Sequence, residues 1–135
     1  MQITRQADYA LRAALFLAAL APDQKASTAE IAERQRIPPS FLAKIIAQLS
    51  IAGLIQTARG ARGGVSLARP ADQVSILEII EAIDGPLSLN ACSDDPTDCP
   101  CHEDCPLCDL WAETRAELAA KLGGAKLSAY VTAFA

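Results

Sequence analysis

Three observations predict that this sequence forms a mainly α-helical fold with one short β-hairpin. Apolar residues make up 51% of the 135 residues, enough for a core, but aromatic residues make up only 4%, which argues against a β-sandwich. Apolar side chains recur at helical spacing in several segments. One glycine-rich stretch separates two short segments with the residue pattern of strands. The length is that of one ordinary domain.

Capping residues define the start of the first two helices. The first is expected after Thr4, and it ends near Pro22. Its apolar residues at helical spacing are Ala7, Leu11, Ala14, Leu15 and Ala18. The second follows Ser27, with Glu30 at the spacing of a capping box, and stops near Gln35.

A third helix begins at Pro39, because proline suits the first turn of a helix, and runs to about Ile51. One side of it carries an apolar stripe that is expected to pack against the first two helices, formed by Leu42, Ile45, Ile46 and Leu49. The opposite side carries Ser40, Lys44 and Gln48. Gly53 supplies the left-handed residue that ends the helix.

A hairpin follows, since the periodicity changes after Gly53. Leu54–Ala58 and Val65–Ala68 are the expected strands, and Arg59–Gly64 is the glycine-rich turn between them. Three helices followed by a two-stranded hairpin is the element order of a winged helix-turn-helix. In that fold the third helix enters the major groove of DNA and the hairpin reaches the flanking backbone or the minor groove.

The second half of the chain is expected to contain two helices separated by a cysteine-rich loop. Ser75 and Glu78 have the spacing of a capping box before a fourth helix, which Gly85 ends. A last long helix runs from about Leu107 to Leu122.

Charge differs strongly between the two halves. Residues 1–70 hold nine Lys or Arg and four Asp or Glu, a balance of +5, and residues 71–135 hold three and twelve, a balance of −9. The overall charge of −4 would by itself argue against a nucleic acid partner. The split instead predicts two functions on one chain, with the basic half suited to phosphate.

The residues expected to contact DNA are Ser40, Phe41, Lys44, Gln48, Arg59 and Arg62. Lys and Gln side chains can pair with guanine and adenine edges, a phenyl ring can meet a thymine methyl group or be buried in the core, and arginines on a glycine support can approach the duplex closely. The alternative is a protein-interaction module of the same shape whose arginines are only solvated.

All five cysteines lie between Cys92 and Cys108, and their number is odd, so they do not form the disulfide framework of a secreted protein. The start of the chain has no secretion signal, which makes a reducing cytoplasm the expected compartment. Thiolates this close together can converge on a metal. Zinc would take the compact set Cys99, Cys101, Cys105 and Cys108.

Iron–sulfur clusters also take cysteines, and the spacing alone does not choose between them and zinc. Another alternative is a redox enzyme that uses Cys105 and Cys108, although a thioredoxin-like pair of this kind follows a strand in a βαβ unit, which is not predicted here. A lone loop histidine such as His102 is more often solvated than a ligand.

The chain resembles the Rrf2 family of bacterial transcription regulators. The resemblance rests on Met1–Leu11, Ile31–Leu42, the hairpin turn Arg59–Gly64 and the cysteines that precede Leu110 and Trp111. It implies a homodimeric repressor rather than an enzyme, whose long C-terminal helix crosses to the partner. It also implies an iron–sulfur cluster, 2Fe-2S or 4Fe-4S, that senses redox state, nitric oxide or iron–sulfur supply and controls affinity for a palindromic operator.

The family's three cysteine ligands, carried over by position, are Cys92, Cys99 and Cys105. The sequence departs from the pattern because Cys101 and Cys108 are surplus. Cys108 stands where IscR-like members have a histidine ligand, and Asp8 stands where NsrR-like members supply a carboxylate from the other subunit. The fourth ligand is therefore expected to be Cys108 or the partner's Asp8, unless Asp8 is only a surface carboxylate in a first helical turn.

The expected organisation is thus a winged helix-turn-helix DNA-binding domain over residues 1–70. Residues 71–135 follow as a linker helix, a cluster-binding cysteine loop and a dimerisation helix. One chain has room for one such domain, so a long site would require two chains.

Overall fold

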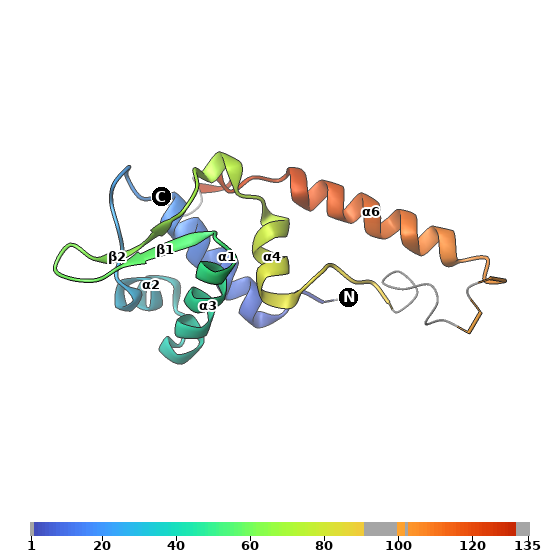
Figure 1. Ribbon diagram of the computed structural model, residues 1–135, viewed down its shortest axis with the longest axis horizontal. Coiled ribbons are helices and arrows are strands. Elements are labelled where there is room, and N and C mark those ends of the chain that lie inside the picture. Colours follow the sequence, from blue (N-terminus) through green and yellow to red (C-terminus); the bar gives the residue numbers. More distant parts are fainter. Residues whose placement is uncertain (1, 91–99, 102, 132–135) are drawn as a thin grey trace.

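The computed structural model describes residues 2–90, 100–101 and 103–131, and it confirms the mainly helical class with one hairpin. The elements are α1 (Arg5–Ala18), α2 (Thr28–Gln35), α3 (Pro39–Ile51), β1 (Ile55–Ala58), β2 (Gly64–Leu67), η1 (Ala71–Gln73), α4 (Ile76–Asp84), α6 (Cys108–Gly124) and η3 (Leu127–Ala129). Helices α1 to α4 and the hairpin gather at one end of the molecule, and α6 extends away from them toward the other end (Figure 1).

The predicted caps are present at the first two helices. The Thr4 hydroxyl accepts from the Ala7 amide at 3.1 Å, and the Ser27 hydroxyl accepts from the Glu30 amide at 3.1 Å. Helix α1 ends at Ala18, four residues before the proline expected to end it. A turn ends it early, because the side chain of Gln24 accepts from the amide of Ala21 at 3.0 Å.

The core lies where α1 and α3 face each other, and the apolar stripe predicted for α3 is buried in full. The residues that α1 buries are Ala7, Tyr9, Ala10, Ala13, Ala14, Phe16 and Leu17. Leu11 and Leu15, which were expected in that stripe, are only partly buried. The stripe is displaced because α1 also packs against α4, and residues beyond position 70, among them Ile79 and Leu127, belong to the same core.

Helix α3 ends in a Schellman motif at Gly53, which has the φ of +75° that the motif requires. The amide of Leu54 donates to the carbonyl of Leu49 at 3.0 Å, so Leu54 belongs to the helix end and β1 starts one residue later than expected. The strands are antiparallel, with Ile55 opposite Leu67.

The hairpin turn depends on Gly63. Its amide donates to the carbonyl of Gly60 at 2.9 Å, and a Cβ atom added at Gly63 would lie 2.3 Å from the carbonyl oxygen of Ala58. A third segment joins the hairpin, because Ala26 pairs with Val65 through two backbone hydrogen bonds of 2.7 and 3.0 Å. The turn is therefore held on a small, firmly paired base.

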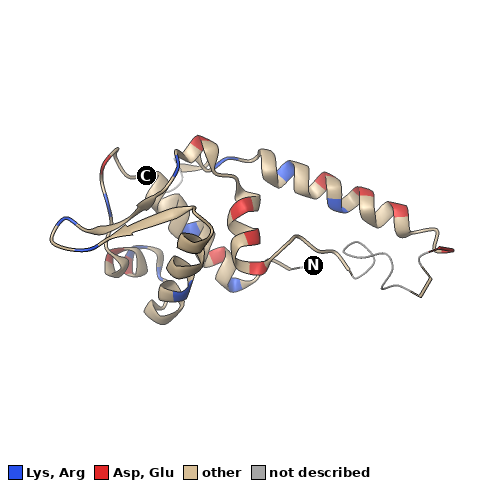
Figure 2. Ribbon diagram, viewed as in Figure 1, with Lys and Arg blue, Asp and Glu red and all other residues tan. Residues whose placement is uncertain are grey.

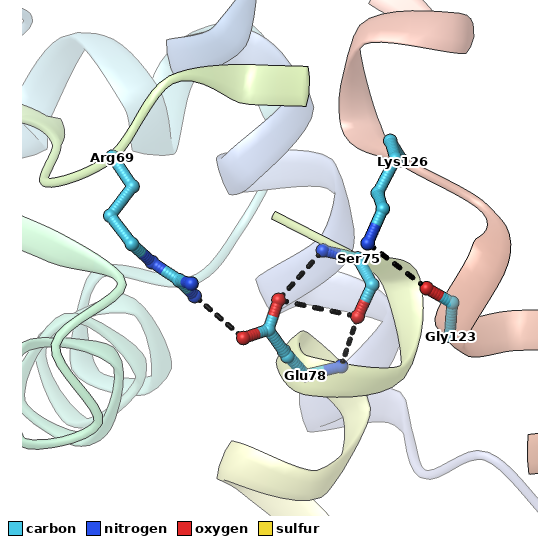
Figure 3. Close-up of polar contacts among 5 residues, drawn as sticks. All are labelled: Arg69, Ser75, Glu78, Gly123 and Lys126. Carbon is cyan, nitrogen blue, oxygen red and sulfur yellow. Dashed lines mark hydrogen bonds and ion pairs between the residues drawn. The ribbon is translucent and has the colours of Figure 1, made fainter. Parts of the chain in front are cut away.

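The capping box predicted for α4 is complete. The Ser75 hydroxyl accepts from the Glu78 amide at 3.1 Å, and the Glu78 carboxylate accepts from the Ser75 amide at 2.9 Å. The same carboxylate pairs with Arg69 at 2.7 Å, which connects the segment after β2 to the start of α4 (Figure 3). Partial burial alone would raise the pKa of Glu78, but the Ser75 and Arg69 contacts together outweigh it and lower that pKa.

Glu78→Gln is expected to lower the free energy of unfolding by about 1 kcal/mol at pH 7, because it weakens the cap and removes a half-exposed ion pair. The pKa of Glu78 is depressed in the folded state, so its contribution is present above the ordinary value of 4.5 and is lost as pH falls below it. Urea unfolding at pH 7 and pH 3.5 measures this. The difference from the unmodified protein should shrink at pH 3.5, with Glu33→Gln as control, and an equal difference at both pH values would contradict it.

Helix α6 is anchored to the rest of the chain near its C-terminal end. The amide of Ile76 donates to the carbonyl of Ala125 at 2.8 Å, and the amide of Leu127 donates to the carbonyl of Val74 at 2.9 Å. A second connection lies further back along the helix, where Arg115 Nε donates to the carbonyl of Leu87 at 2.6 Å.

The helix continues through Gly123 and Gly124, although the sequence suggested an end at Leu122. Lys126 explains the extra turn, because its Nζ donates to the carbonyl of Gly123 at 3.1 Å and satisfies a terminal acceptor (Figure 3). None of the 17 residues of α6, all of which the structure describes, is buried. No helix within the described ranges is long and apolar enough to cross a membrane.

Candidate nucleic-acid interface and cysteine segment

The structure places the predicted α3 residues on one face, opposite the buried stripe. Ser40 and Lys44 are exposed and Gln48 is partly exposed. Ala43 and Ala47 are also exposed, and sequence analysis did not select them. Helical spacing from Ser40 could have found both. Their short side chains allow another molecule to approach this face of the helix closely.

Phe41 was expected either to meet a thymine methyl group or to be buried in the core, and its position is intermediate. Its side chain is 40% exposed, and its ring meets the ring of Tyr9 edge to face, with centroids 6.2 Å apart and an interplanar angle of 64°. This contact joins the first turn of α3 to the first turns of α1.

The two arginines of the hairpin turn, Arg59 and Arg62, are exposed. Neither has an ion-pair partner among the residues that the structure describes. Figure 2 shows basic residues on the hairpin, α1 and α3, whereas acidic residues follow one another along α4 and occur together with basic ones along α6. The hairpin arginines are therefore available for an external anion.

Arg12 links α1 to the end of α2, and sequence analysis missed this role. Its Nη1 donates to the carbonyl of Gln35 at 3.0 Å, and its guanidinium carbon lies 4.9 Å from the centroid of the Tyr9 ring. Its Nε lies 3.5 Å from Asp8 Oδ2, yet it is buried and makes no hydrogen bond to any described residue. Arg12 therefore connects α1 to the turn before α3.

Three of the five cysteines fall among the described residues, and Cys92, Cys99 and His102 lie outside them. Cys101 is exposed, and Cys105 and Cys108 are partly exposed. All three thiols are free. Cys108 is the first residue of α6, and its amide donates to the carbonyl of Cys105 at 3.4 Å, so Cys105 lies in the turn just before the helix.

Asp8 lies on α1, and 62% of its side chain is exposed. The start of α6, with Cys105 and Cys108, lies at the far end of the molecule (Figure 1). Within the described ranges, no three Cys, His, Asp or Glu side chains gather as a metal site would require. A site that combined Asp8 with these thiols would therefore need a second copy of the chain.

The donors that the structure does describe suit a soft metal or an iron–sulfur cluster. Uncommitted, accessible thiols can lose their protons to become thiolate ligands, and an exposed carboxylate can complete such a set.

Comparisons with known proteins bear on the family and the fold of the chain. The sequence model of the Rrf2 family, described as an iron-dependent transcriptional regulator, matches residues 3–133. Two proteins from two strains of Mycobacterium tuberculosis, both named as HTH-type transcriptional regulators, are 40% identical to this chain over 88 residues. That match covers 65% of this chain and 55% of each relative, so only about half of their length is compared.

Solved structures with a similar fold include CymR of B. subtilis, titled the global cysteine regulator. It has a TM-score of 0.78 and 23% identity, over 98% of this chain and 97% of that one. IscR of T. potens has a TM-score of 0.75 and 24% identity, over 100% of this chain and 89% of that one. The oxidised form of CymR from Staphylococcus aureus has a TM-score of 0.74 and 27% identity, over 97% of this chain and 96% of that one.

Proposed function

Because this chain belongs to the Rrf2 family of transcriptional regulators, we propose that it is a dimeric repressor with an iron–sulfur cluster. Redox state, nitric oxide or iron–sulfur supply would act on the cluster and so change affinity for a palindromic operator. The observation that carries this proposal is the spatial separation of two features. A basic face on α3 and the hairpin lies at one end of the molecule, and free thiols lie at the other.

The DNA-binding face would act through α3 and the hairpin turn. Ser40, Lys44 and Gln48 would meet base edges or phosphates in the major groove. Arg59 and Arg62 would reach the adjacent minor groove or backbone, since each is preceded by an alanine and followed by a glycine, which leave it little obstructed.

Two features support a homodimer. Helix α6 leaves Leu107 and Leu110 about half exposed, at 47% and 48%. Beside its C-terminal end lies a largely apolar groove of about 940 Å³, lined by Leu11, Leu15, Ile76, Leu122 and Tyr130 among others. A second copy would cover these surfaces and place two DNA-binding faces on one duplex.

The proposed cluster ligands are Cys92, Cys99 and Cys105, with Cys108 or the partner's Asp8 as the fourth. A bound cluster would supply a redox-active iron centre that can react with oxidants and nitric oxide, which the chain's own side chains do not provide. The chain's own residues then link this segment to the DNA-binding end, because α6 is tied to the start of α4 by the backbone bonds between residues 74–76 and 125–127. Arg69 and Glu78 continue that link to the segment after β2.

A thiol-switched or zinc-bound regulator of the same fold is the second candidate. Its support is the likeness to the oxidised form of S. aureus CymR at 27% identity, together with the free thiols of Cys101, Cys105 and Cys108. Zinc would use Cys99 with these three.

Purification without oxygen, followed by visible spectroscopy and analysis of iron, acid-labile sulfide and zinc, tests the proposal. The protein is expected to be coloured and to contain iron and sulfide. Cys105→Ser is expected to remove most of both, whereas Asp109→Asn, an exposed change one residue after Cys108, should leave them unchanged. A colourless protein with stoichiometric zinc would overturn the cluster and favour the second candidate.

A further inference from the structure

A hollow of about 760 Å³ lies beside the N-terminal part of α1 and is lined by three arginines. Arg5 is the first residue of α1, Arg12 follows two turns later, and Arg36 comes from the end of α2. Among the described residues that line the hollow, Asp8 is the only acidic one. Residues from distant parts of the sequence therefore bring positive charge to one place.

Most of this charge is not compensated within the described part of the chain. Asp8 lies 3.5 Å from Arg12, whereas Arg5 and Arg36 have no ion-pair partner there, and both are exposed. Arg12 is held by the carbonyl of Gln35, so it contributes fixed charge to the wall. The hollow is consequently suited to an anion that two exposed guanidinium groups can bind.

The backbone at Arg36 gives a second reason to connect this residue with a ligand. Arg36 caps α2 in the left-handed conformation, with φ of +53°, a position at which glycine is usual and arginine is disfavoured. The amide of the next residue, Ile37, donates to the carbonyl of Ala32 at 2.9 Å, which fixes this turn. The cap accordingly directs an exposed, unpaired guanidinium into the hollow's lining.

The hollow adjoins the start of α3. Tyr9 belongs to its lining, and the Tyr9 ring contacts Phe41 in the first turn of α3 at a centroid distance of 6.2 Å. Arg36 precedes Pro38, the N-cap of α3, by two residues. When the start of such a helix enters a major groove about 12 Å wide, the sugar–phosphate backbone at the groove edge passes beside it.

We propose that Arg5 and Arg36, with Arg12 behind them, bind one backbone phosphate of duplex DNA at the edge of the groove that α3 enters. This inference rests on the proposed DNA-binding function with Cys108 as the fourth cluster ligand, because Asp8 lines the hollow and a partner's thiol segment bound to it would cover the hollow. It adds a contact outside α3 and the hairpin. Such a contact fixes the position of α3 on the duplex without reading sequence.

The test measures binding of the full chain to a mixed-sequence duplex by fluorescence anisotropy over a series of salt concentrations. The variant carries both Arg5→Gln and Arg36→Gln, and the matched control is Arg34→Gln, an exposed arginine of α2 outside the hollow. The double variant is expected to bind about tenfold more weakly. Its slope of log K against log salt should be smaller by about 1, as for one lost phosphate contact, and the control should keep the original slope.

Circular dichroism and thermal unfolding verify that the double variant is folded, and Arg5→Lys with Arg36→Lys should restore most of the salt slope because charge is kept. An unchanged slope in a folded double variant would overturn the inference. If Arg59→Ala and Arg62→Ala weaken binding while the double variant does not, the proposed function stands and this contact alone fails. If the unmodified chain binds no duplex, both fail.

A free phosphate ion is the other possible source of the same ligand chemistry. Inorganic phosphate at constant ionic strength should not change the thermal unfolding of the unmodified chain more than that of the double variant. If phosphate raises the unfolding temperature of the unmodified chain only, and the double variant keeps the original salt slope for DNA binding, the hollow binds a small anion and the DNA contact is overturned.

Discussion

Replacing Arg59 and Arg62 together with alanine is expected to reduce affinity for duplex DNA at least about 30-fold, because each groove-contacting arginine contributes about 1 to 3 kcal/mol. Both side chains are exposed, and neither is committed to an ion pair among the described residues, so free energy gained with DNA is not offset by a lost internal contact. Fluorescence anisotropy with duplexes that contain or lack an A·T-rich flank measures the effect. The loss should be greater on the A·T-rich duplex, whose narrow minor groove attracts arginine.

Two further variants distinguish the effect of the hairpin turn's position from the effect of positive charge. Gly63→Ala retains both arginines but introduces a Cβ atom 2.3 Å from the Ala58 carbonyl oxygen, so the turn must move and affinity should fall without a change in charge. Lys121→Ala removes a positive charge from α6, outside the hairpin, and should have little effect. If the Lys121 variant loses as much affinity as the double arginine variant, the hairpin has no special role.

Mixing two inactive variants is expected to restore cluster binding if the fourth ligand comes from the partner subunit. Asp8→Ala chains keep all five cysteines, and Cys105→Ser chains keep Asp8. Each variant alone should lose most of its iron and its visible absorption. A mixed dimer would have one complete site, made by the cysteines of one chain and the carboxylate of the other, so about half of the sites within mixed dimers should recover.

The single variants distinguish the two candidates for the fourth ligand, Cys108 and the partner's Asp8. If Cys108 is that ligand, Asp8→Ala alone should keep its spectrum and Cys108→Ser should change it. Asp104→Ala, an exposed carboxylate beside Cys105, is the control for loss of negative charge near the thiols. If neither Asp8→Ala nor Cys108→Ser alters the spectrum, both candidates are wrong and Cys101 becomes the next one to replace.

Local signals in the sequence predicted the elements well. Thr4, Ser27 and Ser75 form the caps expected of them, and Gly53 ends α3, because each of these interactions spans only a few residues. The apolar stripe of α3 was predicted for the same reason. The stripe of α1 was predicted only in part, because that helix contacts α2, α3, α4 and the strand β2, and their positions depend on the whole fold.

The candidate sites were predictable in part. Glycines and arginines adjacent in sequence identified the hairpin turn, and cysteine spacing identified thiol donors. The arginine hollow was not foreseen, because Arg5, Arg12 and Arg36 come together only through the packing of α1 on α2. Asp8 was considered as a ligand from the resemblance, and its location on α1, far from the start of α6, means that a site combining it with the thiols would need a second chain.

The exposure of α6 has a consequence for how the regulator responds to its own abundance. A 17-residue helix with no buried residue receives little support from its own chain, and isolated helices of such length are marginal in water. In the proposed dimer, the missing support comes from a second copy, so mass action couples order in α6 to protein concentration. In that proposed dimer, the amount of protein in the cell would act as an input beside the chemical signal. A chain newly made at low copy number would have an incompletely supported α6 until more copies accumulate.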